Sequence, residues 1–494
     1  MEYIPRFLGP RWTLLYGSFD GVEKFAVEEL HRMVQFFLPY VIEVLPAQDL
    51  PAQKPQDHVL LVGTPQTVPL LEEVLHRKGL SIPSHPEGYL TAGFTSPWNA
   101  ERKMVVIAGN QSSGVLYGVE DFNSRILSNR VMPDKITAKS LRQALDGIEE
   151  FSFQEGPHID MRGIWTWGHV IYDYRRFLDH MARLRLNLLT IWDDIPPINC
   201  KDVIEYAHQR GVKVFLGFPW GWGMDLDLTL SSDRQRIQEM VVQHYQNYIS
   251  PMPIDGIYFQ TLTEHGNLEL NGRSVAAITC NLVNEITAAL YKIKPDLQIH
   301  FGLHATSIRE RYTDLAGLDR RVTIIWEDAG TLPYTYLPAL EINNSPATGW
   351  YAPNTFEATL DYSQKLATFR PGTPFGLVPK GWTNLDWPGE FEHHSSFLSG
   401  IRSKAFMHER LEQIRPRWDK VNALWLRYYR QGINFYQSML NISPGNMVVE
   451  GLIEDGLFEE QIQPAVALYA ETLWNPSRVP EDILAQALSA YYQD

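Results

Sequence analysis

The chain has 494 residues, which is too long for one ordinary domain and predicts two or three. Hydrophobic residues make up 44% of the chain and charged residues 20%, as expected for a globular protein with a large core. The formal net charge of −15 argues against a nucleic-acid partner, because an acidic surface repels phosphate backbones.

Residues 1–155 are predicted to form a small α/β domain. Short apolar runs predict strands, and apolar residues at helical spacing predict helices between them. This order of elements fits a sheet with helices on one face. The strands are expected at Trp12–Tyr16, Tyr40–Leu45, His58–Gly63, Gly88–Phe94 and Met104–Ala108, and the helices at Val22–Phe37, Pro65–Lys78 and Gly114–Ser128.

After Pro157 the pattern changes, and apolar strand-like runs alternate with helical segments through residues 156–400. Eight such alternations predict a closed (β/α)8 barrel, the TIM barrel of the α/β class. An open doubly wound sheet is the alternative, but no Gly-rich phosphate fingerprint follows any strand. The predicted strands are Met161–Trp167, Asn187–Trp192, Val212–Phe218, Ile254–Gln260, Leu297–Leu303, Val322–Trp326, Thr348–Tyr351 and Phe375–Val378.

Residues 401–494 are predicted to be helical. Arg417–Met439 and Glu454–Leu473 both show long helical periodicity. Pro416 is expected to open the first helix, and Asn475-Pro476 to end the second. We interpret this region as the last helix of the barrel followed by a helical C-terminal extension.

Acidic residues stand at the predicted C-terminal ends of strands four and six, where (β/α)8 enzymes carry their catalytic groups. Glu264 follows strand four, and Glu327 and Asp328 follow strand six. Glycosidic cleavage uses such a pair, because one carboxylic acid protonates the leaving oxygen while a second carboxylate activates water or attacks the anomeric carbon. We predict Glu264 as the general acid and Asp328 or Glu327 as its partner. Asp328 is the first choice because it lies further past the strand.

Other residues near the strand ends suit a sugar ligand. A tryptophan ring packs on the C–H face of a pyranose, a histidine orients an acid, and a lysine or arginine binds a substrate carboxylate. Each also has a structural alternative as a core residue, a satisfied histidine or a helix cap. The predicted substrate-binding residues are Arg162, Trp165, His169, Asp193, Trp222, His265, His304, Trp326, Lys380 and Trp382.

The sequence carries no signature of a metal or cofactor. It lacks an HExxH motif, paired cysteines, an EF-hand loop, a GxSxG elbow and a P-loop. Cys200 and Cys280 are its only cysteines, too few for a disulfide framework. No signal-peptide pattern opens the chain, and no stretch is apolar enough to span a bilayer. We expect a cytoplasmic protein without a cofactor or membrane partner, and homo-oligomerisation stays open.

Two stretches resemble known glycoside hydrolases. Met104–Phe122, MVVIAGNQSSGVLYGVEDF, resembles the end of the N-terminal domain that precedes the barrel in families 20 and 67, the β-N-acetylhexosaminidases and α-glucuronidases. Pro157–Asp194, which begins PHIDMRGIW and ends LNLLTIWDD, is similar to the start of the family 20 barrel. The resemblance implies that Arg162 binds hydroxyls of the terminal sugar and that Glu264 is the acid. It departs from family 20 at Thr263, where that family has the Asp that orients the substrate acetamide.

This departure argues against acetamide-assisted catalysis. The N-terminal domain resembles family 67 more nearly, which implies an enzyme similar to the α-glucuronidases. We therefore expect an exo-acting glycoside hydrolase that removes a terminal sugar, with an acidic sugar as the first candidate, from an oligosaccharide or glycoconjugate. One alternative is a β-N-acetylhexosaminidase or sialidase-type exoglycosidase on the same fold. Another is a non-catalytic carbohydrate-binding barrel.

Overall fold

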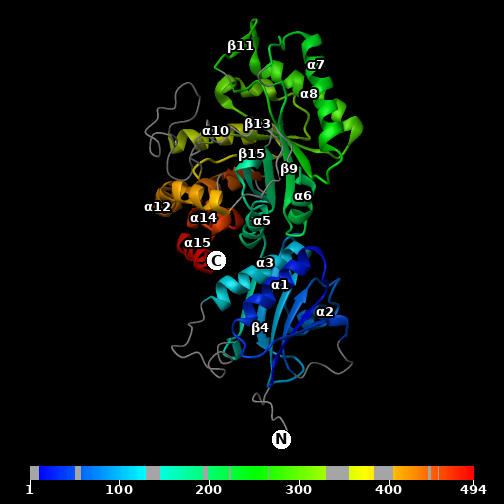
Figure 1. Ribbon diagram of the computed structural model, residues 1–494, viewed down its shortest axis with the longest axis vertical. Coiled ribbons are helices and arrows are strands. Elements are labelled where there is room, and N and C mark those ends of the chain that lie inside the picture. The colour runs from blue at the N-terminus through cyan, green and yellow to red at the C-terminus, as the bar shows by residue number, and fades with distance from the viewer. Residues whose placement is uncertain are drawn as a thin grey trace. The chain divides into compact units, whose positions relative to one another are not determined.

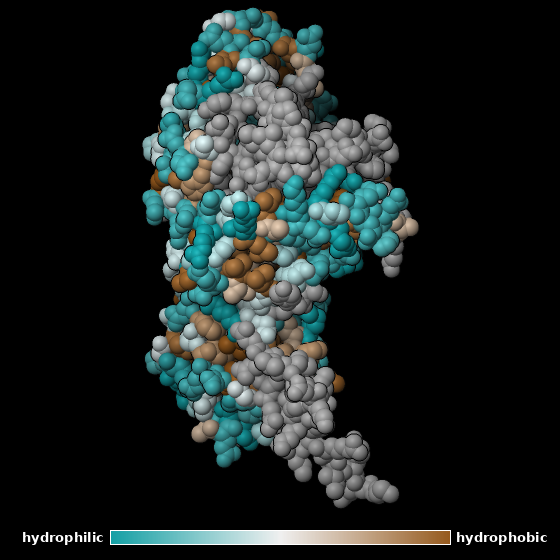
Figure 2. Space-filling view, turned by 90° about the vertical axis from the view of Figure 1, so that its left-hand side faces the viewer, coloured by the Kyte–Doolittle hydropathy of each residue, from teal (hydrophilic) through white to brown (hydrophobic). Residues whose placement is uncertain are grey.

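The computed structural model describes residues 10–49, 57–128, 145–192, 198–221, 224–264, 266–329, 355–382, 404–442, 447–453 and 456–493. The chain divides into two compact units, the first formed mainly by Met1–Pro157 and the second mainly by the chain from His158 onward. Figure 1 shows the first unit in blue and cyan and the second in green to red. Hydrophilic residues cover most of the described surface on the face shown in Figure 2. Among the described helices, none has the length and apolar character needed to cross a membrane.

The first unit contains a six-stranded sheet in the order β2-β1-β3-β5-β4-β6. The pairs that join β1, β2, β3 and β5 are parallel, whereas β4 runs antiparallel to both of its neighbours. The edge strand β6 was not predicted, because its residues alternate between partly and fully exposed and include no long apolar run. The strands are β1 (Trp12–Tyr16), β2 (Glu43–Pro46), β3 (His58–Gly63), β4 (Tyr89–Thr95), β5 (Lys103–Gly109) and β6 (Phe151–Glu155).

Helices cover both faces of this sheet, and the expectation of helices on one face is wrong. Leu71 and Val74 of α2 (Leu70–Lys78) belong to the same buried cluster as Leu61 of β3. Gly118 of α3 (Ser112–Phe122) lies against Ile107 of β5, whose side chain points to the opposite face. The helix α1 (Gly21–Gln35) packs beside α3. A strand such as β3, buried at every residue, has no alternation that could show which face a helix covers.

The second unit is built on a closed parallel barrel of eight strands. Each strand pairs in parallel with the next, and the last strand, β16, pairs with both β15 and β7 and so closes the barrel. This confirms the fold class predicted from the sequence. The strands in order are β7 (Met161–Trp167), β8 (Leu188–Trp192), β9 (Lys213–Pro219), β10 (Gly256–Gln260), β13 (Gln298–Leu303), β14 (Val322–Trp326), β15 (Phe375–Leu377) and β16 (Met447–Leu452).

The closing strand was placed wrongly from the sequence. The run near Phe375, predicted as the eighth strand, forms the seventh, and Thr348–Tyr351 lies outside the described residues. The eighth strand, Met447–Leu452, falls in the region predicted to be helical, so the barrel extends past residue 400. Its six residues are all buried and give no alternation, and periodicity cannot separate so short an apolar run from a buried helix segment.

Helices surround the barrel strands (Figure 1). Pro416 does not open a helix as predicted but lies inside a helix of 39 residues, α12. The helix α14 ends at Trp474, directly before the predicted Asn475-Pro476 break. The helices of the second unit are α5 (Tyr174–Arg183), α6 (Cys200–His208), α7 (Ser231–His244), α8 (Val275–Ile293), α10 (Phe356–Thr368), α12 (Lys404–Ile442), α13 (Leu457–Glu460), α14 (Pro464–Trp474) and α15 (Pro480–Gln493).

The barrel interior combines aromatic rings with buried polar groups. The rings of Trp165 and Trp192 are stacked with centroids 6.0 Å apart, and the ring of Tyr258 lies 6.1 Å from Trp165. His300 Nδ1 lies 3.1 Å from Oε1 of the fully buried Glu450. Branched aliphatic residues usually fill the interior of such a barrel. The buried polar groups found here therefore indicate a functional site inside the barrel.

Candidate active site

His304 links two acids of the barrel mouth through its imidazole ring. It follows β13, which lies between β10 and β14, and it is only 4% exposed. Its Nε2 atom lies 3.2 Å from Oε2 of Glu327, and its Nδ1 atom lies 3.0 Å from Oδ1 of Asp328. Burial alone would lower the pKa of His304, but the two carboxylates raise it to about 10. At neutral pH His304 is therefore an imidazolium held between two acids.

Glu327 is an ionised carboxylate that faces the barrel interior. The Tyr258 hydroxyl donates to its Oε1 over 2.6 Å, and the Gln260 amide donates to both oxygens over 2.7 and 2.8 Å. Burial alone would raise the pKa of Glu327, but His304, Lys380 and the Tyr258 hydroxyl lower it to about 2. Tyr258 and Gln260 are alternate residues of β10 and share its inward face.

Gly302 of β13 makes room for this arrangement. A Cβ atom at this position would lie 2.1 Å from Oε1 of Glu327 and 2.5 Å from the Tyr258 hydroxyl oxygen. No real side chain makes contacts this short, so a larger residue would force Glu327 or Tyr258 to move. The glycine is therefore required by the close approach of two side chains.

Asp328 is turned toward the loop that follows β13. The backbone N–H of Ala305 donates to its Oδ2 over 2.5 Å, while its Oδ1 faces His304. The Oγ1 of Thr263 accepts a hydrogen bond of 3.2 Å from the backbone N–H of His304. These contacts tie together the segments that follow β10, β13 and β14, and they occupy both oxygens of Asp328.

Glu264 differs from Glu327 in the direction of its pKa shift and in its contacts. It is partly buried, and its Oε2 atom makes no hydrogen bond within the described ranges. Burial raises its pKa, the charges of Glu327 and Asp328 raise it further, and His304 and Lys380 oppose them. The acids that follow strands four and six therefore belong to one electrostatic cluster, in which the pKa of Glu264 is raised and that of Glu327 is lowered.

Lys380 supplies the second positive charge of this cluster. It follows β15, forms an isolated bridge with Leu452 of β16, and is partly exposed. Its ammonium group interacts with the charges of Glu264 and Glu327. In the part of the chain that the structure describes, it forms neither a hydrogen bond nor an ion pair. Lys380 is thus a cation at the barrel mouth with no direct partner among the described residues.

Three predicted substrate-binding residues do not face the barrel mouth, and their prediction is wrong. Arg162 is fully buried at the start of β7, where it donates to the carbonyls of Arg185 and Ile159. Trp326 packs against Tyr362 of α10, with ring centroids 5.0 Å apart. Trp382 stacks on Trp425 of α12 at 4.4 Å. All three contact the helical layer or the strand starts, because residues of opposite parity on one strand point to opposite sides of the barrel.

The other predicted residues divide into two groups. His304 and Lys380 join the acid cluster, and Trp165 lies inside the barrel beside Tyr258. Asp193, Trp222 and His265 lie outside the described residues. The backbone of His169 is described, but its side chain is not.

Sequence reasoning missed Tyr258, Gln260 and Gly302. The signal for the first two was present, because alternate residues of the run GIYFQ share a face, and a polar Gln on an apolar strand is unusual. Gly302 gave no such signal, since only the positions of its neighbours show why a glycine is needed. No group of three His, Cys, Asp or Glu side chains suited to a metal ion occurs among the residues described.

No family model matches the sequence, and no curated protein matches it. Solved structures do match in three dimensions, each at 10% sequence identity. One is a family 138 glycoside hydrolase that targets pectin rhamnogalacturonan II (TM-score 0.52; 96% of this chain and 51% of that chain are covered). Another is a mutant β-hexosaminidase from Streptomyces plicatus in complex with its product GlcNAc (0.53; 97% and 90%). A third is the family 20 β-N-acetylhexosaminidase from Streptomyces coelicolor A3(2) (0.52; 97% and 91%).

These matches show a shared fold. This chain covers most of the length of the two Streptomyces structures, whereas it spans about half of the family 138 enzyme. A shared fold does not determine activity or substrate, which depend on the residues of the barrel mouth.

Proposed function

We propose that this protein is an exo-acting glycoside hydrolase whose active site lies at the C-terminal end of the barrel. The observation that carries the proposal is the contrast between Glu264, whose pKa is raised, and Glu327, whose pKa is lowered, within one charge cluster. Glycosidic cleavage uses one protonated and one ionised carboxyl group, and the environment of each sets its role. The shared fold with glycoside hydrolases supports the same class.

In the proposed reaction Glu264 is the general acid. Its proton passes to the glycosidic oxygen as the bond to the anomeric carbon breaks. Water then supplies the hydroxyl that replaces the leaving group, and the proton that this water loses returns to the Glu264 carboxylate. Burial raises the pKa of this carboxyl group, which favours the protonated form that a general acid needs. Its Oε2 is buried and makes no hydrogen bond within the described structure, so a substrate oxygen would have no protein partner to displace there.

We assign the second carboxylate to Glu327, although the sequence favoured Asp328. The partners of Glu327, Tyr258 and Gln260, come from the inward face of β10, whereas Asp328 is held by the backbone of Ala305. A carboxylate with so low a pKa is a weak base but a strong fixed negative charge. It suits the stabilisation of the positive charge that develops on the sugar ring in the transition state. Asp328 is then a positioning residue that orients His304.

Lys380 favours an acidic sugar as substrate. An ammonium group without a direct partner in the described structure, at the barrel mouth and within the charge cluster of the proposed general acid, is suited to a sugar carboxylate. Thr263 occupies the place of the acetamide-orienting Asp of family 20, and it is fully buried and already bonded to the backbone of His304. This arrangement favours the α-glucuronidase-like reading over the acetamide-assisted one.

The experiment that tests the proposal is the hydrolysis of nitrophenyl and methylumbelliferyl glycosides of neutral, N-acetylated and acidic sugars. Glu264→Gln is expected to lower kcat on the best substrate by ~10²–10⁴-fold, the usual contribution of a general acid, without changing the melting temperature. The exposed Glu310→Gln is the matched control and should match the wild type. Near-normal turnover in Glu264→Gln removes this residue from the mechanism. Saturable sugar binding without product on any glycoside favours the non-catalytic barrel.

Lys380→Met tests the preference for an acidic sugar. The variant is expected to raise KM for an acidic glycoside while it leaves KM for a neutral one unchanged, and Lys380→Arg should restore part of the loss. Because Lys380 lowers the pKa of Glu264, its removal should also move the alkaline limb of the kcat profile to higher pH. Equal effects on acidic and neutral substrates would contradict the assignment of Lys380 to a substrate carboxylate.

A further inference from the structure

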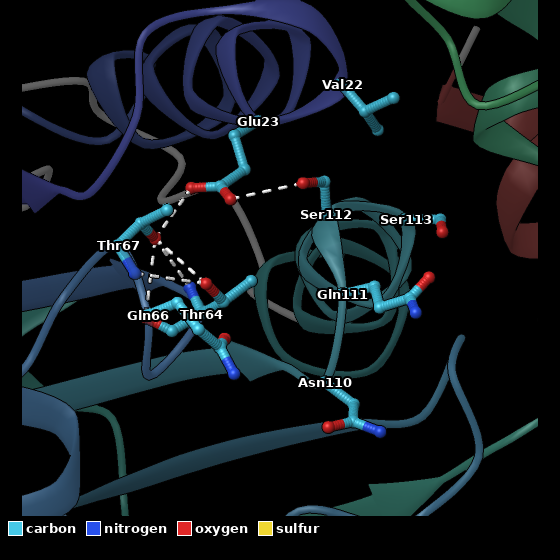
Figure 3. A pocket seen from close by; sticks show the side chains of 9 residues that line it. All are labelled: Val22, Glu23, Thr64, Gln66, Thr67, Asn110, Gln111, Ser112 and Ser113. Atoms are coloured by element: carbon cyan, nitrogen blue, oxygen red, sulfur yellow. Dashed lines mark hydrogen bonds between the residues drawn. The ribbon is translucent and has the colours of Figure 1, made fainter.

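A cavity of about 570 Å³ lies in the N-terminal unit, at the carboxyl ends of β1, β3 and β5 (Figure 3). Its walls come from the start of α1, the loop after β3 and the turn that leads from β5 into α3. From β1 the chain crosses to β2 on one side, and β3 pairs with β1 on the other. The crevice is therefore a topological switch point, the position at which open α/β sheets hold ligands.

The floor of this cavity is held rigid by hydrogen bonds. Glu23 is 3% exposed, and its Oε2 accepts from the Thr67 hydroxyl over 3.0 Å and from the backbone N–H of Ser18 over 3.2 Å. Its Oε1 accepts from the Ser112 hydroxyl over 3.2 Å, and the Thr64 and Thr67 hydroxyls lie 3.1 Å apart (Figure 3). A carboxylate with three donors is already satisfied, so the floor needs no cation to stabilise it.

The rim carries polar side chains with hydrogen-bonding groups that have no partner within the described residues. The side chains of Gln66, Gln111 and Ser113 make no hydrogen bond within the described residues. Asn110 donates its amide to the carbonyls of Ser84 and His85, over 3.1 and 3.2 Å, which leaves its own oxygen as an acceptor. Each glutamine amide offers two donors and an acceptor. The rim therefore presents several neutral donors and acceptors on a rigid base.

The lining excludes a phosphate or nucleotide ligand. It holds no Lys, Arg or His, and the buried Glu23 would repel an anion. Gly109 and Gly114 have the spacing of a phosphate-binding loop, but Val115 and Leu116 stand where such a loop has its Lys and its Ser or Thr. A ligand for this cavity must be uncharged and rich in hydrogen-bonding groups.

We propose that the cavity of the N-terminal unit binds a neutral, hydroxyl-rich ligand of the size of a monosaccharide or disaccharide. Its volume lies within the ~300–1,000 Å³ range of small-molecule sites, and its lining is polar where most such sites are apolar. The hydroxyl groups of such a ligand both donate and accept hydrogen bonds, and so match the amide side chains of the rim. Charged or apolar ligands lack this match. This assignment rests on the chemistry of the cavity and does not depend on the activity of the barrel.

The test is saturation-transfer NMR on the full chain with methyl glycosides of neutral sugars and neutral disaccharides as probes. Binding of inorganic phosphate, which has no carbon-bound proton, is followed by ³¹P NMR line broadening. The double variant Gln66→Ala/Gln111→Ala removes the rim, and the loss of two neutral hydrogen bonds should weaken sugar binding by about tenfold or more. Both side chains are exposed, so the melting temperature should not change. Gln154→Ala, an exposed glutamine on β6, is the matched control.

A second comparison distinguishes sugar binding in the N-terminal cavity from sugar binding in the barrel. The signal from the N-terminal cavity should persist in Glu264→Gln and in Lys380→Met, and it should fall only in the rim variant. The proposal is overturned if no neutral sugar binds at tens of millimolar concentration, or if the rim variant binds as the wild type does. It is also overturned if inorganic phosphate binds and is lost from the rim variant, because the ligand would then be an anion.

Discussion

At the residue scale, the candidate site depends on a single imidazolium. His304 separates Glu327 from Asp328, and without its charge these two buried carboxylates would lose the cation that lies between them. Removing one member of a buried ion pair typically costs ~3–5 kcal/mol, because the remaining charge stays buried. The same residue that arranges the acids therefore contributes to the stability of the barrel.

The first prediction is that His304→Gln lowers barrel stability most between about pH 4.5 and 6.5. The folded pKa of His304, about 10, lies above its ordinary value of 6.5, so its contribution is complete below pH 6.5 and is lost as the pH rises toward 10. The folded pKa of Glu327, about 2, lies below 4.5, so its contribution is complete above pH 4.5 and is lost as the pH falls toward 2. Denaturant unfolding of both proteins across this range, followed by tryptophan fluorescence, measures the difference.

The control for this prediction is His208→Gln, which breaks a pair with Asp255 that is 38% and 28% exposed. A pair this accessible to solvent should contribute no more than ~1 kcal/mol. A difference between wild type and His304→Gln that does not vary with pH would show that the imidazolium is not the source of the stability.

Gly302 supports a second prediction. Gly302→Ala is expected to lower kcat, because the added Cβ displaces the Glu327 carboxylate or the Tyr258 hydroxyl, and to cost ~1–3 kcal/mol of stability through overpacking. Gly317→Ala is the control, since the nearest atom to its new Cβ would be the Cys280 sulfur at 3.5 Å, an ordinary contact. Hydrolysis of the best glycoside and thermal unfolding check both effects. Unchanged kcat in Gly302→Ala would show that the position of Glu327 does not matter for the reaction.

The residues that sequence reasoning placed wrongly share one cause. Arg162, Trp326 and Trp382 stand on or just after barrel strands, as expected, but their side chains pack against other parts of the unit. Proximity to a strand end does not state the direction of a side chain, which alternates from one residue to the next. The sequence could not distinguish Glu327 from Asp328 for the same reason, because the turn after β14 decides which of two adjacent acids faces inward.

At the element scale, β16 is the least obvious part of the barrel and one of its most important. It pairs with β15 and β7, and it places Glu450 beside His300 in the interior. A barrel without it would leave two strands with unpaired edges. The strand–helix alternation predicted the other seven strands of the barrel, but the long helix α12 separates β16 from them and hides the last repeat.

The third prediction concerns this strand. A chain that ends at Ile442 lacks β16 and is expected to lose the cooperative unfolding of the barrel unit, because β7 and β15 have no partner. A chain that ends at Val479 keeps β16 and α14 and should retain it. Near-UV circular dichroism during thermal unfolding distinguishes the two chains. A cooperative barrel transition in the shorter chain would show that closure by β16 is dispensable.

At the scale of the whole molecule, the sequence predicted the architecture better than the details of the site. The barrel fold, seven of its strands and most of the N-terminal sheet follow from periodicity, which depends only on which residues are apolar. The meeting of Glu264 with the strand-six acids also followed, because a closed parallel barrel brings all strand ends to one rim. The supporting residues Tyr258, Gln260 and Gly302 needed coordinates, since their roles depend on contacts between strands.

The pairing of β7 with β16 also affects how this protein is made. Met161 and its partner Val448 lie at opposite ends of the barrel segment, so a nascent chain exposes the first strand long before the ribosome has synthesised its neighbour. The sheet of the N-terminal unit is complete at Glu155 and can fold during synthesis. Until β16 has been synthesised, β7 lacks one of its pairing partners, and contacts this distant in sequence slow folding. Translation speed and chaperone supply should therefore affect the yield of the barrel far more than that of the N-terminal unit.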